Sequence, residues 1–265
     1  MPMQPIHLWP IDERRRITGV LTDIDDTLTT EGAITPDALQ ALAALRAAGL
    51  QVIAITGRPV GWSVPFASTW PIDAIVAENG SVALVAAGTR KIYQQDADTR
   101  AANFARLQQV AQQIVREVPG ATLAQDSAGR ETDIAIDHSE FTQLPPAQIE
   151  QVVTIMQREG LQATVSSIHI NGWIGAHDKL VGARWIVREL LRRELDSELA
   201  RWVYVGDSTN DQLMFQHFPH SVGVANIRRF EAQLQHQPRY ITRDERGAGF
   251  AELAHALLTQ TAGRA

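Results

Sequence analysis

Short apolar stretches alternate with longer amphipathic ones along the first eighty residues of the chain. Thr35 and Pro36 are typical of a helix start, and Gly49 is typical of a helix end. These signals predict strands at 17–22, 52–55 and 74–77, a helix at 38–48, and a shorter irregular helix before the third strand. Strands and helices that alternate at this spacing predict a parallel sheet with helical crossovers.

The middle of the chain has a different rhythm, in which hairpin-like strand pairs mix with two long helices. We expect strands at 81–86, 90–94, 121–125, 132–137, 161–165 and 167–171, and helices at 99–118 and 145–159. This mixture predicts a separate α+β unit. We place it at 83–177, with boundaries accurate to a few residues.

After residue 177, apolar strands and amphipathic helices alternate again up to the end of the chain. This alternation predicts helices at 180–195, 212–217, 227–234 and 249–261, and strands at 202–205, 221–224 and 240–242. The fold class expected from the whole pattern is α/β, with a Rossmann-like parallel sheet and helices on both faces. Residues 1–82 and 178–265 would form this core, and 83–177 would be an inserted α+β domain.

Composition narrows the classes of protein further. The chain has 265 residues, 45% of them hydrophobic, and no cysteine. Disulfides, zinc–thiolate sites and a cysteine nucleophile are therefore excluded, and a reducing cytoplasm is the expected location. The net charge of −6 argues against a binder of nucleic acid or of anionic membranes. We see neither a secretory signal nor eighteen apolar residues in a row.

Three carboxylates follow the first predicted strand within four residues: Asp23, Asp25 and Asp26. Like charges this close repel one another strongly unless a cation or a proton lies among them. The carboxyl ends of strands in an open α/β sheet are also where ligands bind. A metal site and a solvated acidic turn are both consistent with this stretch taken alone.

Polar side chains also stand at the ends of other predicted strands. They are Thr56 and Gly57 after the second strand, Lys179 before the helix at 180–195, and Asp207, Asn210 and Asp211 after the strand at 202–205. Strand ends converge on one edge of such a sheet, so these groups can meet. Carboxylates can hold Mg²⁺ through oxygen, and another can attack phosphorus. A hydroxyl, a backbone N–H and an ammonium can hold phosphoryl oxygens.

Each of these residues also has a purely structural interpretation. Thr56 and Gly57 fit an ordinary strand-to-helix turn, and Asp207 and Asp211 fit a helix N-cap and a first-turn acid. Lys179 fits a surface position. Lysine is rare here, however, since only two of the 24 lysine and arginine residues are lysine. A compact ammonium at this position suits a phosphate, which favours the chemical interpretation.

Four motifs in a fixed order carry a resemblance to a known family. They are Asp23-x-Asp25-x-Thr27-Leu28, then Thr56-Gly57-Arg58, then Lys179, then Gly206-Asp207-Ser208-x-Asn210-Asp211. This series resembles the haloacid dehalogenase-like superfamily. The long insertion after the third strand, together with Glu78-Asn79-Gly80, resembles the branch with its cap there, which includes Cof-type and sucrose-phosphate-phosphatase-type enzymes. Asp26 departs from the glycine of many members, and we interpret it as a turn residue.

The resemblance implies a role for each acidic residue. Asp23 would attack phosphorus and become an aspartyl phosphate. Asp25 would protonate the leaving alkoxide and then activate water. Asp23, the main-chain carbonyl of Asp25, and Asp207 would bind Mg²⁺, and Asp211 would support the metal shell or orient the lysine.

The resemblance also implies which groups hold the phosphate. Thr56 and the N–H of Gly57 would bind the phosphoryl group, with Asn210 nearby. Lys179 would neutralise both the nucleophile and the phosphate. Asn79 and Gly80 are typical of a hairpin turn, and we assign them no catalytic role.

Four residues near the end of the insertion are candidates for the substrate cleft: His169, Asn171, Trp173 and His177. Trp173 could stack on a sugar ring, but an aromatic residue buried at the domain junction is the more common case. The acidic site does not require histidine ligands, because oxygen donors already suit a hard cation.

The predicted function is that of a Mg²⁺-dependent phosphatase acting on a small phosphorylated metabolite, a sugar phosphate above all. A phosphomutase of the same branch is one alternative, but it would need cationic groups in the cap to hold a second phosphate. Residues 83–177 contain no such cluster in the sequence. A non-catalytic phosphoacceptor or binding module is the other alternative, although it would need neither Asp25 nor a large cap.

Overall fold

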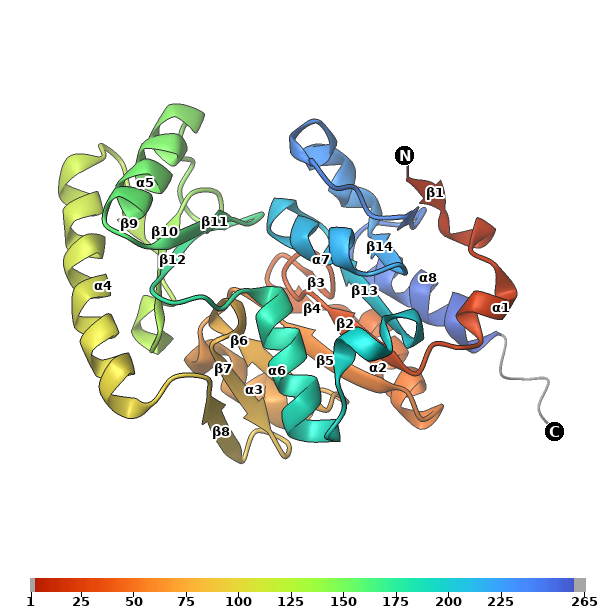
Figure 1. The fold of residues 1–265 in the computed structure, drawn as a ribbon. Helices are drawn as coiled ribbons and strands as arrows, with labels where there is room; N and C mark the ends of the chain where they lie inside the picture. Colours follow the sequence, from red (N-terminus) through yellow and green to blue (C-terminus); the bar gives the residue numbers. More distant parts are fainter. Residues whose placement is uncertain (1–2, 260–265) are drawn as a thin grey trace.

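The computed structural model describes residues 3–259, and within them one large sheet and one smaller sheet dominate (Figure 1). The large sheet has nine strands in the order β1 (Gln4–Pro5), β15 (Tyr240–Ile241), β14 (Ser221–Gly223), β13 (Trp202–Gly206), β2 (Gly19–Thr22), β5 (Gln51–Ile55), β6 (Ala74–Ala77), β7 (Val82–Val85) and β8 (Arg90–Tyr93). The pairs from β1 to β6 are parallel, and β7 and β8 are antiparallel. The central strand, β2, therefore lies between β13 and β5.

Helices cover both faces of the large sheet because its central strands are apolar on both sides. In β2, Val20 belongs to one buried cluster and Leu21 to the other. The first cluster joins the sheet to α2 (Pro36–Ala47), α3 (Val60–Thr69) and α8 (Arg246–Leu258). The second joins it to α6 (Lys179–Leu191) and α7 (Gln212–His217). The expected α/β fold with helices on both faces is confirmed.

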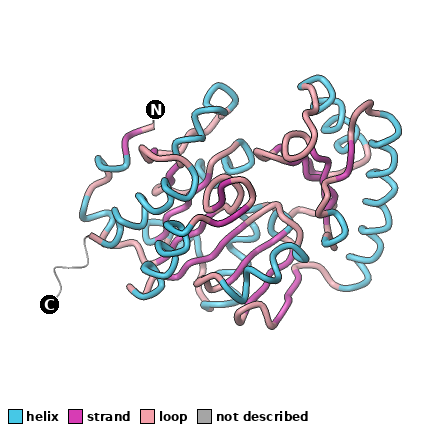
Figure 2. The backbone as a smooth tube through the Cα atoms, turned by 180° about the vertical axis from the view of Figure 1, so that it is seen from behind, coloured by secondary structure: helices cyan, strands magenta, loops and turns pink. Residues whose placement is uncertain are grey.

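The smaller sheet is antiparallel and has its own apolar core. Its strands lie in the order β11 (Gln162–Val165), β12 (His169–Trp173), β10 (Asp133–Asp137) and β9 (Thr122–Leu123). Helices α4 (Ala97–Glu117) and α5 (Pro146–Arg158) pack on one face through residues such as Leu107, Ile136 and Val152. The helices lie on the outer side, so the other face of this sheet is turned towards the large sheet (Figure 2).

The hairpin β7–β8 differs from the sequence-based expectation, because it extends the large sheet instead of belonging to the insertion. The sequence signals a hairpin but not the strand that it will pair with, which depends on the position of β6. We therefore propose that the inserted domain begins after Tyr93, at the start of α4, and not at residue 83.

Several short elements were not expected from the sequence. They are β1, α1 (Ile11–Arg14), and the hairpin of β3 (Thr29–Thr30) and β4 (Ala33–Ile34). The segment Ala225–Gln233 is a 3₁₀ helix, and α3 contains Pro65 in its interior. Helix α8 ends at Leu258, whereas the predicted helix reached 261; residues 260 and 261 lie outside the described residues.

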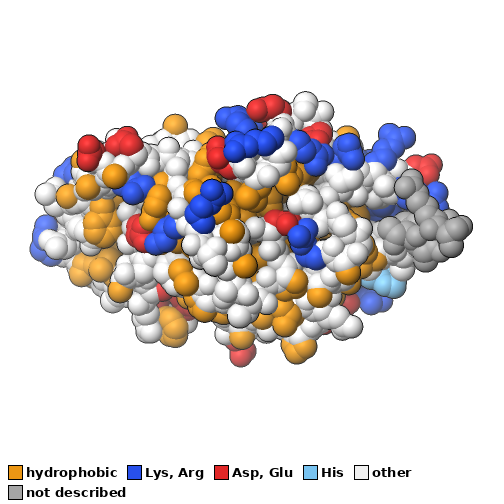
Figure 3. All heavy atoms as spheres, turned by 90° about the horizontal axis from the view of Figure 1, so that it is seen from below, with side chains coloured by type: hydrophobic (Ala, Val, Ile, Leu, Met, Phe, Trp, Pro, Cys, Tyr) orange, Lys and Arg blue, Asp and Glu red, His pale blue; other side chains and the backbone are white. Residues whose placement is uncertain are grey.

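The face at the bottom of Figure 1 carries basic and acidic side chains interspersed with hydrophobic ones (Figure 3). Exposed ion pairs near α6 join Arg184 to Asp196 at 2.9 Å and Arg188 to Glu194 at 3.0 Å. Exposed pairs of this kind contribute at most about 1 kcal/mol each. Among the described residues, no helix is both long enough and apolar enough to cross a membrane.

Candidate active site

Asp23 directly follows β2 and lies close to the start of α6 and to the loop that follows β13. Its backbone N–H donates to the carbonyl of Val205 at 2.9 Å, so the chain is still fixed to β13 at this point. Lys179, the first residue of α6, is buried and donates from Nζ to Asp23 Oδ1 and to Asp211 Oδ1, both at 2.7 Å. Asn210 Oδ1 lies 3.3 Å from the same nitrogen. Four of the predicted site residues thus meet.

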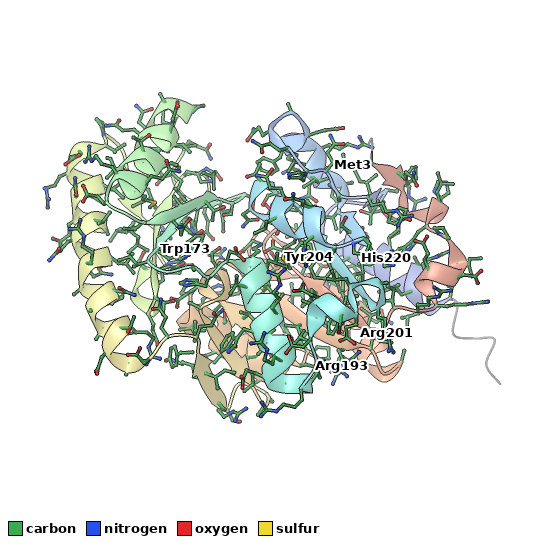
Figure 4. The ribbon with its side chains drawn as sticks, viewed as in Figure 1. Met3, Trp173, Arg193, Arg201, Tyr204 and His220 are labelled. Carbon is green, nitrogen blue, oxygen red and sulfur yellow. The ribbon has the colours of Figure 1, made fainter. Side chains whose placement is uncertain are left out.

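The backbone after β13 holds Asp211 in place. Gly206 has no side chain where a Cβ would meet the carboxylate of Asp211, so that carboxylate lies directly against the strand end. Asp211 Oδ2 accepts hydrogen bonds from the N–H groups of Asp207 at 2.9 Å and Ser208 at 3.1 Å. The hydroxyl of Tyr204, which lies on β13 near the centre of Figure 4, donates to Oδ1. Both oxygens of Asp211 therefore already have partners.

Asp207 differs from Asp211 because one of its oxygens is free. Oδ2 accepts a hydrogen bond from Asn226 at 3.0 Å, whereas Oδ1 is buried without a hydrogen-bond partner. Asn226 also donates to the carbonyl of Asp26 at 3.0 Å and accepts from the N–H of Arg246 at 2.9 Å. It thereby ties the loop after β2 to Asp207. Sequence reasoning missed Asn226, which lies in no motif.

Charge is poorly balanced in this cluster. Asp23, Asp207 and Asp211 each offer an oxygen within 4.8 Å of the others, and Lys179 is the cation among them. Burial, together with the charges of Asp211 and Asp25, raises the pKa of Asp23 to about 7 although Lys179 opposes the shift. Burial and the charge of Asp23 raise the pKa of Asp207 well above its usual range.

These acids fit a metal cation. The donors are all oxygen, they are buried, and Asp207 presents an oxygen without a partner. A cation there would remove the repulsion that otherwise favours protonation of Asp23 and Asp207. Asp211 is less suited to direct contact with a metal, because its oxygens already bind Lys179, Tyr204 and backbone N–H groups.

Thr56 and Gly57 lie at the end of β5, on the other side of β2. Thr56 is fully buried, and its Oγ1 accepts a hydrogen bond from the N–H of Arg58 at 2.9 Å. The carbonyl of Gly57 accepts from Arg130 at 2.9 Å and from Asn171 at 3.3 Å, so side chains of the insertion hold this loop. Gly57 lines the narrow cavity in front of Asp23, whereas Thr56 does not.

Asp25 faces the insertion and is held by Arg58. Its Oδ1 accepts a hydrogen bond from Arg58 Nε at 2.9 Å. The same guanidinium donates to Asp126 at 3.1 Å and to Glu140 at 2.7 Å, and Glu140 also lies 2.8 Å from His169 Nε2. Arg58 therefore connects Asp25 to two acids of the inserted domain. The sequence offered one signal, since Arg58 directly follows Thr56 and Gly57 in their motif.

Glu78 makes a second connection between the two domains. It is fully buried after β6, and its carboxylate accepts from the N–H of Val60 at 3.0 Å and from the N–H of Thr132 at 2.6 Å. Arg130 and Asp133, 2.7 Å apart, are buried beside it. Burial, opposed by Arg130, raises the pKa of Asp133 to about 7. Glu78 thus acts as a structural anchor.

The aromatic residue expected at the domain junction is buried. Trp173 lies on β12 and its Nε1 donates to the carbonyl of His177 at 2.8 Å (Figure 4). Burial lowers the pKa of His177 to about 4, so this ring is neutral at physiological pH. The two rings stack on each other with centroids 5.7 Å apart. The structural interpretation of Trp173 therefore holds, whereas His169 and Asn171 line the cavity.

A narrow cavity lies between the strand ends and the face of the smaller sheet. The core contributes Asp23, Asp25 and Asn210, and the insertion contributes His169 and Asn171. A hydrogen bond from Thr209 Oγ1 to the carbonyl of Val165, 2.8 Å long, keeps the two sides together. A small group bound here would touch both domains and be shielded from bulk water.

Comparison with known proteins agrees with this fold. A family model described as haloacid dehalogenase-like hydrolase matches residues 20–117. The match covers the strands of the core from β2 to β8 and reaches into the insertion as far as the end of α4. No curated protein matches the sequence significantly.

Solved structures share the fold along almost the whole chain. A protein from Thermoplasma acidophilum has a TM-score of 0.70 and 16% identity, covering 91% of this chain and 98% of its own. The sucrose-phosphatase of Synechocystis sp. PCC6803, solved with sucrose and phosphate, has a TM-score of 0.65 and 16% identity, covering 92% and 98%. A sugar phosphatase of subclass IIB has a TM-score of 0.61 and 16% identity, covering 93% and 99%.

Proposed function

We propose that this protein is a Mg²⁺-dependent phosphatase that hydrolyses a small phosphorylated metabolite, a sugar phosphate, through an aspartyl phosphate. One observation carries the proposal: Asp23 is paired with Lys179 beside the unpartnered oxygen of Asp207, and Asp25 faces the same covered cavity. Structural neighbours that act on sugar phosphates support it. The absence of cysteine supports a reducing compartment such as the cytoplasm.

Asp23 would act as the nucleophile. Its carboxylate forms a bond to phosphorus as the bond from phosphorus to the ester oxygen breaks. Lys179 holds one oxygen of Asp23 and lowers the repulsion between this anion and the phosphate. A Mg²⁺ ion held by Asp23, Asp207 and the carbonyl of Asp25 would supply the remaining positive charge. The N–H of Gly57 and the amide of Asn210 would bind phosphoryl oxygens.

Asp25 would move the proton in both half-reactions. It donates a proton to the leaving alkoxide, and it then accepts one from the water that attacks the aspartyl phosphate and releases inorganic phosphate. Arg58 holds Oδ1 of Asp25, which fixes the direction of the other oxygen. Asp211, whose oxygens are occupied, would position Lys179.

The test is phosphate release from a panel of phosphorylated metabolites with Mg²⁺ and with a chelator. We expect turnover only with the metal, and we expect Asp23→Asn to lower kcat by at least about 10³-fold with an unchanged circular dichroism spectrum. Acid quenching of wild-type enzyme with ³²P-labelled substrate should trap label on the protein. The exposed Asp12→Asn is the matched control. Retained turnover in Asp23→Asn would refute the mechanism.

A further inference from the structure

A second, wider cavity of about 360 Å³ adjoins the narrow one in front of Asp23. The two cavities share Asp25, Arg58 and Ile168, so they adjoin at the residue proposed to protonate the leaving group. Its walls come from both domains, namely the β3–β4 hairpin of the core and the loop 139–141 of the cap. A substrate whose phosphoryl group lies at Asp23 would place the remainder of the molecule here. The volume suits a small metabolite.

Acidic side chains outnumber basic ones on this wall: Asp25, Asp26, Glu31 and Glu140 face Arg58 and Arg246. Neither arginine is free of acids. Arg58 donates from Nε to Asp25 and from both terminal nitrogens to Glu140. Arg246 Nε lies 3.1 Å from Asp26 Oδ1. The cavity therefore has a surplus of carboxylate oxygens, which accept hydrogen bonds from hydroxyls and repel anions.

Glu140 is held in its ionised form by cationic and hydrogen-bonding partners. Burial would raise its pKa, but hydrogen bonds from His169 and Arg58 outweigh burial and lower that pKa to about 2. Glu31 lies in the turn between β3 and β4, is exposed, and has no hydrogen-bond partner among the described side chains. The carboxylate of Glu140 is thus fixed by its partners, whereas that of Glu31 is free to bind a ligand.

Phe141 and Ile168 supply the apolar part of the cavity, and Phe141 is the more exposed of the two. Its side chain is 63% exposed, the highest value among the large hydrophobic residues that the structure describes. Its backbone is nevertheless fixed, because buried Asp137 accepts hydrogen bonds from the N–H groups of Ser139, Glu140 and Phe141 at 2.9 to 3.1 Å. A solvent-exposed aromatic ring on a fixed loop at a cavity wall suits stacking on the C–H face of a sugar ring.

We propose that this cavity binds the leaving group of the substrate and selects one that carries hydroxyls and no negative charge, with Phe141 and Glu31 as the residues that determine this specificity. The proposal rests on the phosphatase function above. It follows that esters with a second phosphate or a carboxylate are poor substrates. A sugar phosphate of similar size whose sugar carries no charge, or a positive one, is a good substrate.

The experiment compares kcat/KM for esters that differ in one charge. The pairs are glucose 1-phosphate with glucuronate 1-phosphate, and glycerol 3-phosphate with 3-phosphoglycerate; p-nitrophenyl phosphate reports the basal chemistry. We expect kcat/KM of the wild-type enzyme to be at least about 10-fold higher for the member of each pair whose leaving group is uncharged. Glu31→Lys should reduce this preference by about 10-fold. Glu150→Lys makes the same charge change on the exposed side of α5 and should leave the preference unchanged.

Phe141→Ala tests the apolar wall separately. It should lower kcat/KM for glucose 1-phosphate by about 10-fold relative to glycerol 3-phosphate, whereas Leu123→Ala, at another exposed apolar position of the cap, should not. Equal rates within each charge pair, or equal effects of Glu31→Lys and Glu150→Lys, would overturn the proposal while p-nitrophenyl phosphate is still hydrolysed. If no ester is hydrolysed, the phosphatase function itself fails and this proposal fails with it.

Discussion

Two groups of buried or half-buried carboxylates lie on either side of Asp25, and their acids are paired with cations in different ways. The first, the core cluster, consists of Asp23, Asp207 and Asp211 around the single ammonium of Lys179. One oxygen of Asp207 is buried without a hydrogen-bond partner. The pKa of Asp23 and that of Asp207 are both raised, mainly by burial and then by the neighbouring charges.

The second group, the junction cluster, consists of Asp126, Asp133 and Glu140 with the guanidiniums of Arg58 and Arg130. Each of these acids accepts at least one charge-assisted hydrogen bond, and Asp126 accepts from both arginines. The planar fork of arginine can pair with several carboxylates at once, which lysine cannot do in the same geometry. This cluster joins the two domains, and each of its acids has an arginine partner, although burial still raises the pKa of Asp133 to about 7.

The same residue types thus serve two purposes. A buried acid that has all its partners contributes to packing and domain position, whereas a buried acid with a free oxygen has affinity for a cation. The difference predicts opposite responses to mutation. Loss of a cation from the junction cluster should destabilise the protein, and loss of an acid from the core cluster should stabilise the metal-free protein.

Arg130→Met should have the largest effect on stability. Arg130 is almost fully buried and pairs with Asp133, so its removal leaves a buried carboxylate without its cation. We expect the free energy of unfolding to fall by about 3–5 kcal/mol, as measured by urea denaturation. Arg116→Met, at an exposed position of α4, should change it by less than about 0.5 kcal/mol. A loss below about 1 kcal/mol for Arg130→Met would mean that the ion pair of Arg130 with Asp133 does not stabilise the junction.

Asp207→Asn should act in the opposite direction. Without a metal, it removes one of the three mutually repelling acids, and we expect the free energy of unfolding to rise by about 1–2 kcal/mol in a chelating buffer. Millimolar Mg²⁺ should raise the Tm of the wild type and not that of the variant. Thermal scans with and without Mg²⁺ measure both effects, and Asp12→Asn on the surface is the control. Equal Mg²⁺ stabilisation of wild type and variant would place the metal elsewhere.

The sequence predicts the core cluster well because its residues follow regular elements. Asp23 and Asp207 come directly after apolar strands, and Lys179 begins an amphipathic helix. The rule that parallel strand ends share one edge is then enough to bring them together. What this rule does not give is which oxygens are occupied. The hydrogen bonds of Asp211 to Tyr204 and to backbone N–H groups depend on the exact course of the loop.

The junction cluster could not be predicted in the same way. Asp126, Arg130 and Glu140 lie in loops of the cap, with no spacing that relates them to Arg58. Their contact depends on how the smaller sheet is placed over the larger one, which no local pattern encodes. The position of β7 and β8 in the large sheet has the same origin, since a hairpin signal does not name the neighbour of the hairpin.

The smallest effect is expected at Glu140, where the junction cluster meets solvent. Its pKa of about 2 in the folded protein lies below the ordinary value of 4.5, so the ionised form stabilises the fold. This contribution is fully present above about pH 4.5 and is lost as the pH falls from there towards about 2. With solvent screening, Glu140→Gln should lower the free energy of unfolding by about 1 kcal/mol at neutral pH.

The difference between wild type and Glu140→Gln should therefore shrink steadily as the pH falls below 4.5, because protonation of Glu140 removes the charge that the variant lacks. Urea denaturation at several pH values between 3 and 7 measures it, and Glu150→Gln on exposed α5 should show no such trend. A difference that stays constant over this range would show that Glu140 acts through packing alone. The junction would then owe its stability to Arg130, Asp133 and Glu78, which are shielded from solvent.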